Sequence, residues 1–169
     1  ATAAAAYTTG ILTATVSDTA VNLKALANEG TNVITVAMSG TTAAAADIIL
    51  VNADTAGLIT STVGTITGSA ADVKTVFAAN DGTQMTGFET SAVTISGGAT
   101  VADANIISAA TTGAVAGAIS DTDIATLKTL GETGNGYTVT VADTTIAAAD
   151  LKTLNTVSYT HLRAHETHE

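Results

Sequence analysis

The chain has no cysteine, no proline and no tryptophan, and aromatic residues make up only 3% of its 169 positions. Without cysteine, the protein does not rely on a disulfide framework. So few aromatic rings argue against a globular core built on large side chains. Small and β-branched residues instead suit thin, regular layers in which backbones approach closely.

Positive charge is equally scarce in this sequence. Five Lys and Arg residues stand against 15 Asp and Glu residues, which gives a formal net charge of −10 at pH 7. Binding to nucleic acid or to an anionic membrane surface needs clustered cations. The composition therefore argues against both classes of partner.

Long apolar runs and a leader segment are missing as well. No stretch approaches the roughly 18 uncharged apolar residues of a membrane-spanning helix. No basic residue precedes Ala1–Ala6, as it would in a signal peptide. Because the chain begins without Met, we interpret it as a fragment of a longer protein.

What the chain does contain is a recurring unit, which is clearest in 137–154, YTVTVADTTIAAADLKTL. Tyr137, Val139 and Val141 alternate with threonines, and this alternation predicts a half-buried strand. After a polar turn, Ile146–Leu154 has the apolar spacing of a short helix. Such a unit cannot bury its own apolar face, so it is expected to stack on others.

Five similar units precede this one, and in each a hydroxyl residue followed by Gly or Asp joins the predicted strand to the predicted helix. The last inward strand residues of the six units lie 22, 28, 29, 24 and 22 positions apart. This spacing predicts an α/β repeat solenoid of about six coils, each with one short parallel strand and one short helix. The alternative is a low-complexity Ala/Thr chain with spurious periodicity. The aligned row is Val16, Met38, Ile66, Ile95, Ile119 and Val141.

The same pattern predicts which residues fill the interior and where the domain ends. We expect a frayed lead-in over 1–10, the solenoid over 11–156 and a separate tail over 157–169. The strand residues expected inside are Val16, Ile34, Ile66, Ile95, Ile119 and Val141. The helix residues expected to face them are Leu23, Ile48, Val73, Ile106, Leu127 and Leu151.

The pattern over Ile11–Leu154 resembles the Ala/Thr-rich repeat arrays of very large secreted or cell-surface proteins of marine cyanobacteria and similar bacteria. The phrases that carry the resemblance are ITGSAADVKTVFAAN at 66–80, VTISGGATVADANIISA at 93–109 and ISDTDIATLKTL at 119–130. The resemblance implies an extracellular structural array in which each repeat is a spacer or surface element. It transfers no catalytic residue.

The C-terminal segment differs from the rest of the chain. Val157–Thr167, VSYTHLRAHET, resembles the conceptual translation of a transposon-type sequencing adapter. His161, His165 and Glu166 would otherwise suggest a metal site on one helix face. We favour a non-native tail, because all the histidines and the only arginine lie here: His161, Arg163, His165 and His168.

Aspartates recur near the predicted helix starts, and the candidate calcium ligands are Asp81, Asp121 and Asp123. Calcium needs several oxygen ligands, which the Gly/Asp nonapeptide of calcium-binding repeats supplies. That nonapeptide does not occur in this sequence. Asp at a helix N-terminus also stabilises the helix by about 0.5–1 kcal/mol, and we favour this role. A calcium-binding repeat module stays as the first alternative function.

A second alternative is an ice- or carbohydrate-binding solenoid face made by outward threonines. Only the first and last units carry a full Thr-x-Thr pair, and threonine is in any case a favourable outward strand residue. One predicted outward row is Thr13, Thr35, Val63, Ala92, Ala116 and Thr138. The other is Thr15, Ala37, Thr65, Thr94, Ala118 and Thr140.

No enzyme emerges from the residue inventory. Outside the tail there is no histidine, and the sequence has neither GxSxG nor a phosphate-loop glycine pattern followed by Lys. The four lysines at 24, 74, 128 and 152 are interpreted as a solvated ridge. Together with the absence of enzyme motifs, the resemblance to secreted Ala/Thr-rich arrays implies a structural repeat segment of a large extracellular or cell-surface protein, in a spacer, adhesion or surface-layer role. Its partners would be neighbouring repeats of the parent chain, and apolar ends predict end-to-end self-association.

Overall fold

The computed structural model describes residues 13–26 and 33–157. Over these residues the chain is an α/β fold in which strands and helices alternate. The strands are β1 (Thr13–Asp18), β2 (Val33–Ala44), β3 (Ile59–Ser69), β4 (Met85–Thr86), β5 (Ala92–Ser96), β6 (Val115–Ala118) and β7 (Gly136–Thr138). The helices are α2 (Ala20–Leu23), α3 (Ala45–Asp54), α4 (Ala70–Ala79), α5 (Val101–Ala110), α6 (Ile124–Leu127) and α7 (Ala148–Val157).

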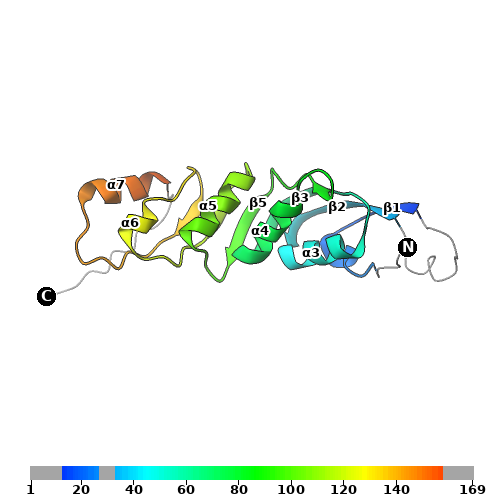
Figure 1. Ribbon diagram of the computed structural model, residues 1–169, viewed down its shortest axis with the longest axis horizontal. Coiled ribbons are helices and arrows are strands. Elements are labelled where there is room, and N and C mark those ends of the chain that lie inside the picture. Colours follow the sequence, from blue (N-terminus) through cyan, green and yellow to red (C-terminus); the bar gives the residue numbers. More distant parts are fainter. Residues whose placement is uncertain (1–12, 27–32, 158–169) are drawn as a thin grey trace.

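The strands form a single parallel sheet that is open, neither closed nor curled, in the order β1-β2-β3-β5-β6-β7, with β4 beside β3. Consecutive strands are therefore neighbours. The molecule is long as a result, and α3 to α7 follow one another along its long axis (Figure 1). We call each strand of this order, together with the helix that follows it, a unit, so that unit 1 is β1-α2 and unit 6 is β7-α7.

The helices pack on one face of the sheet. Right-handed crossovers between consecutive parallel strands place every connecting helix on the same side, and each helix from α2 to α4 contacts the next one. Along β3, Ile59, Ser61 and Val63 are buried, whereas Thr60 and Thr62 between them are exposed. One sheet face thus packs against the helices, and the other is open.

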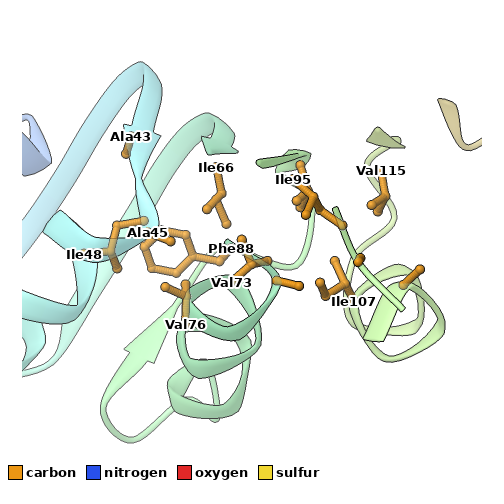
Figure 2. Packing of buried hydrophobic residues seen from close by; sticks show 14 of the residues in the cluster. Ala43, Ala45, Ile48, Ile66, Val73, Val76, Phe88, Ile95, Ile107 and Val115 are labelled. Atoms are coloured by element: carbon orange, nitrogen blue, oxygen red, sulfur yellow. The ribbon is translucent and has the colours of Figure 1, made fainter. Parts of the chain in front are cut away.

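The core is a thin layer between the sheet and the helices. One row of strand residues pairs across four neighbouring strands: Ala43, Ile66, Val93 and Val115. Figure 2 shows Ala43, Ile66, Ile95 and Val115 on the sheet side of this layer and Ile48, Val73, Val76 and Ile107 on the helix side. Phe88, at 0% exposure, is among the largest buried side chains. The layer consists mainly of small and β-branched residues, as the composition predicts.

Most of the predicted interior is confirmed. Among the strand residues, Ile34, Ile66, Ile95 and Ile119 are buried, and Val16 and Val141 pack against the core partly buried. Among the helix residues, the predictions hold for Leu23, Ile48, Val73 and Leu127.

Two predicted helix positions are wrong. Ile106 and Leu151 are 55% and 38% exposed, and Ile107 and Leu154 are buried in their place. In α5 the buried row includes Val101, Ala104 and Ile107, so Ile106 faces solvent. α7 begins two residues later than predicted, at Ala148, and Leu154 is its buried residue.

The predicted alignment of strands is also wrong. Val16 pairs with Val36 and not with Met38, which pairs with Asp18. Paired residues of successive strands are 20, 23, 27, 22 and 20 positions apart. The error arises because Ser39-Gly40 does not turn the chain, and β2 continues through it to Ala44 over 12 residues. At Gly40 the backbone adopts a φ of 140°, which glycine tolerates.

Two further observations bear on the predicted organisation. No helix within 13–26 and 33–157 is long and apolar enough to cross a membrane. The tail lies outside the described residues from 158 onward, as do its candidate metal ligands His161, His165 and Glu166, while Val157 is the last residue of α7.

Candidate functional site

A Thr-x-Gly segment bonds one unit to the unit before it. The Thr111 hydroxyl donates to the carbonyl oxygen of Ser91 at 2.6 Å and accepts a hydrogen bond from the Gly113 N–H at 3.0 Å. The same arrangement recurs at Thr55–Gly57 against the carbonyl of Ile34. In both cases the threonine directly follows a helix, α3 or α5. We call each of these arrangements a Thr-Gly clasp.

The glycine of the clasp is required by space. A Cβ added at Gly113 would lie 2.4 Å from the carbonyl oxygen of Ser91, and one at Gly57 would lie 2.3 Å from that of Ile34. Gly87 makes a similar approach, at 2.2 Å, to the carbonyl of the preceding unit. Real Cβ atoms do not approach this closely, so three successive loops are packed backbone to backbone against the previous unit.

Two of the calcium candidates lie at helix N-termini. Asp121 accepts a hydrogen bond from the N–H of Val101, at the start of α5 in the preceding unit, at 2.7 Å. Asp123 caps α6 and accepts from the N–H groups of Ala125 and Thr126 at 3.1 and 2.9 Å. The hydrogen bonds from Thr126, followed by that from Ala125, lower the pKa of Asp123. Both carboxylates therefore stabilise helix starts.

The third candidate, Asp81, lies in the loop after α4. It accepts hydrogen bonds from the N–H and hydroxyl of Thr83 and from the N–H of Gln84, at 2.8, 2.7 and 3.0 Å. These donors lower the pKa of Asp81 to about 2. Within the described ranges no three His, Cys, Asp or Glu residues gather as a metal ion would need. Calcium binding stays a prediction.

Lysines within or directly after one helix reach aspartates in the first turn of the next. These ion pairs join α2 to α3, α4 to α5 and α6 to α7, and the lysines are not simply solvated. Lys74 donates a hydrogen bond to Asp103, which lowers the pKa of that carboxyl. The pairs are Lys24–Asp47 at 2.7 Å, Lys74–Asp103, and Lys128–Asp150 at 3.1 Å.

The open sheet face does not carry the predicted threonine rows. Val63, placed outward by the sequence reading, is 3% exposed and belongs to the core. Thr15 pairs with Thr35, which the prediction had put in different rows. From β2 to β7 the paired outer row is Ala44, Thr67, Thr94, Ala116 and Gly136. This outer row thus has two adjacent threonines between two alanines, with a glycine at its end.

A hollow of about 430 Å³ opens between the loop that follows α5 and the loop that follows α6. No sequence pattern had singled it out. Side chains with hydroxyl, carboxylate and amide groups line it together with glycine backbone. Its polar lining residues are Ser108, Thr111, Thr112, Glu132, Thr133 and Asn135.

Asn135 and Ser108 are the buried polar members of this lining, at 4% and 6% exposure. The Oδ1 of Asn135 accepts a hydrogen bond from the N–H of Val115 at 2.9 Å. In the preceding unit the corresponding N–H, of Val93, bonds to the backbone carbonyl of Ala114 instead. The Nδ2 of Asn135 is buried and has no hydrogen-bond partner within the part of the chain that the structure describes.

The loop that carries Asn135 is held in a constrained conformation. Glu132 has a φ of 46°, which residues other than glycine rarely adopt. Gly131 donates its N–H to Oδ1 of Asn105 at 2.7 Å, and Nδ2 of Asn105 donates to the carbonyl of Thr129 at 2.9 Å. Asn105 of α5 thereby fixes the entry to the loop.

Comparison with known proteins adds no relative to these observations. No family model, no curated protein and no solved structure matches this chain, so its function is inferred from its own residues.

Proposed function

We propose that the chain is a non-enzymatic structural repeat segment of a large extracellular or cell-surface protein, with a spacer, adhesion or surface-layer role. Its units would form a solenoid of about six coils. The observation that carries the proposal is that the chemically distinctive residues bond one unit to the next. The Thr-Gly clasps, the cap from Asp121 and the Lys–Asp pairs all do so.

Composition supports the same role. Catalysis by acid–base or nucleophilic groups needs side chains brought together, and Asp121, Asp123 and the three paired lysines are used for caps and ion pairs instead. The acidic, cysteine-free sequence and its resemblance to secreted Ala/Thr-rich arrays support an extracellular location. Neighbouring repeats of the parent chain are its proposed partners, and calcium-dependent assembly is the competing possibility.

Thermal unfolding of the full chain, followed by circular dichroism with calcium and then with EGTA, tests this function. We expect a mixed strand and helix spectrum whose midpoint is the same in both buffers, because interunit contacts suffice for folding. A chain that folds only when calcium is present would overturn the proposal in favour of a calcium-binding repeat module. Asp121→Asn would then abolish the calcium response, whereas Asp54→Asn in α3 would not.

End-to-end self-association is part of the proposal. Lys152 in α7 occupies the position of the ion-paired lysines, and Leu151 beside it is 38% exposed. The first described unit offers Asp18, which accepts from Asn22 at 2.8 Å, and Val21, which is 59% exposed. β1 and β7 are the two edges of one parallel sheet. Head-to-tail contact between two copies would bring together opposite charges and both sheet edges.

A charge swap tests this contact by sedimentation velocity on the full chain. We expect the wild type to form larger species with increasing concentration, and Lys152→Asp or Asp18→Lys alone to weaken them. Mixing the two variants should restore association, because each altered end then meets its complement. Asp54→Lys in an interior unit is the control. Concentration-independent monomers in all samples, or no recovery on mixing, would refute the head-to-tail contact.

A further inference from the structure

We propose that the hollow between the loops after α5 and α6 is a binding site for a small neutral polyol, of the size of one hexose unit. The site does not depend on the structural role proposed above. It follows from a local change in how the last two described units meet.

The hollow exists where the Thr-Gly clasp is interrupted. Strand pairing of Ala116 with Gly136 sets an offset of 20 residues, which puts Gly131 at the position of Thr111. Glycine has no hydroxyl to bond to the preceding unit. Asn105 instead holds Gly131 from the side of α5, at 2.7 Å. The loop after α6 is therefore anchored and yet leaves a space of about 430 Å³ beside the loop after α5.

The lining selects the chemistry of the occupant. Among the described residues that line the hollow there is no Lys or Arg, so an anion would have no counter-charge. Glu132 contributes the single carboxyl group among these described residues, which is too few for a dedicated Ca²⁺ site. The lining has no aromatic ring and only two alanines, so an apolar ligand gains little. Hydroxyls, an amide and one carboxylate match the alternating donors and acceptors of a polyol.

Asn135 supplies the strongest single argument for a ligand. A buried donor without a partner is costly, and such groups call for an explanation in a native protein. Oδ1 of Asn135 is already bonded to the N–H of Val115, which leaves Nδ2 to be satisfied. Because Nδ2 is itself shielded from solvent, a polyol hydroxyl in the hollow would become its acceptor after a small rotation of the Asn135 side chain. The carboxyl group of Glu132, which lines the same hollow, can accept hydrogen bonds from further hydroxyls of the polyol.

The test is a ¹H–¹⁵N NMR titration of the full chain with the methyl α-glycosides of glucose, galactose and mannose, each to about 100 mM. We expect at least one glycoside to shift the Asn135 side-chain amide and the Thr112 and Thr133 backbone amides saturably. A dissociation constant on the order of 1–10 mM is expected for so small a ligand without ring stacking. Inorganic phosphate should shift none of them.

Asn135→Asp keeps the acceptor for Val115 and removes the donor, so we expect affinity to fall about tenfold. Asn155→Asp, an exposed change in α7, is the matched control and should bind as the wild type does. The proposal is overturned if shifts rise linearly and scatter over the surface, if Asn135→Asp binds as tightly as the control, or if phosphate gives the same shifts. The wild-type titration alone decides the question if Asn135→Asp does not fold.

Discussion

Replacing Gly113 by alanine should destabilise the protein far more than the same change at Gly131. At Gly113 the new Cβ would lie 2.4 Å from the oxygen and 2.5 Å from the carbon of the Ser91 carbonyl, and 2.6 Å from the Ala92 nitrogen. At Gly131 the closest atom, Oδ1 of Asn105, lies 3.6 Å away, which is an ordinary contact. The two changes are chemically identical, and they differ in what the methyl group meets.

The size of the effect follows from the bonds that must open. The loop has to move by about 1 Å to bring the new Cβ to contact distance. Three hydrogen bonds cross here, from Thr111 to Ser91 at 2.6 Å, from Thr112 to Glu89 at 2.8 Å and from Val93 to Ala114 at 2.9 Å. Losing two of them costs about 2 kcal/mol, and the remaining strain costs about 1–3 kcal/mol.

Gly113→Ala should therefore lower the free energy of unfolding by about 3–5 kcal/mol, a large share of the roughly 5–15 kcal/mol typical of a domain. Gly131→Ala should stabilise by up to about 1 kcal/mol, because alanine loses less backbone entropy on folding. Urea unfolding followed by circular dichroism measures both, and hydrogen exchange should show the loss first in β6 and α5. A difference below about 1 kcal/mol between the variants would refute the backbone packing described here.

Three further predictions use other contacts. Thr111→Val should lower the free energy of unfolding in urea by about 1–3 kcal/mol, because it leaves the Ser91 carbonyl and the Gly113 N–H unbonded. Thr111→Ser keeps the hydroxyl and should retain most of the wild-type stability. Equal stability of the two variants would contradict the role of the hydroxyl. Phe88→Ala should cost about 3–5 kcal/mol by the same assay, since the ring is fully buried, and a loss under about 1 kcal/mol would show that the ring is not in the core. Hydrogen bonds hold the pKa of Asp81 at about 2, below the usual 3.8 of an aspartate. The stability that Asp81 contributes is therefore complete above about pH 4 and is lost as the pH falls towards 2. Asp81→Asn should flatten this acid dependence in thermal melts, and an unchanged profile would contradict the prediction.

The sequence predicted an α/β fold with a parallel sheet because the alternation of buried and exposed residues is a local signal. Val139 and Tyr137 are buried as their spacing requires, and the alternation of strand and helix indicates a parallel sheet. The alignment of strands was not accessible in this way. Ser39-Gly40 has the composition of a turn, yet pairing of β2 with β1 and β3 holds it in a strand. Long-range hydrogen bonds decided the outcome there.

The sequence also could not determine which side of α5 faces the sheet. Ile106 and Ile107 are adjacent isoleucines of equal hydropathy, so composition cannot say which faces the sheet. The choice depends on where α5 begins, and Thr100, whose side chain accepts the N–H of Asp103 at 3.1 Å, fixes that point. A cap assigned one residue away would reverse the prediction.

Of the candidate sites, the Thr-Gly clasps could have been predicted from the sequence and the hollow could not. A threonine two residues before a glycine, directly after a helix, was visible at 55–57 and at 111–113, and could have revealed the clasps. The hollow could not be found in this way, because it results from a group that is missing at Gly131. The effect of the missing hydroxyl at Gly131 can be recognised only when the position of the neighbouring unit is known.

The ion pairs between helices constrain how such an array can change in evolution. They join α2 to α3, α4 to α5 and α6 to α7, whereas α3 carries no lysine for Asp72 of α4. Excising α4 with its strand would leave Asp103 facing a helix without a cation. Excising α4 and α5 together would remove both partners of a pair and leave no orphaned charge. Deleting two such linked units therefore keeps the remaining ion pairs intact, whereas deleting one of them leaves an aspartate without its lysine.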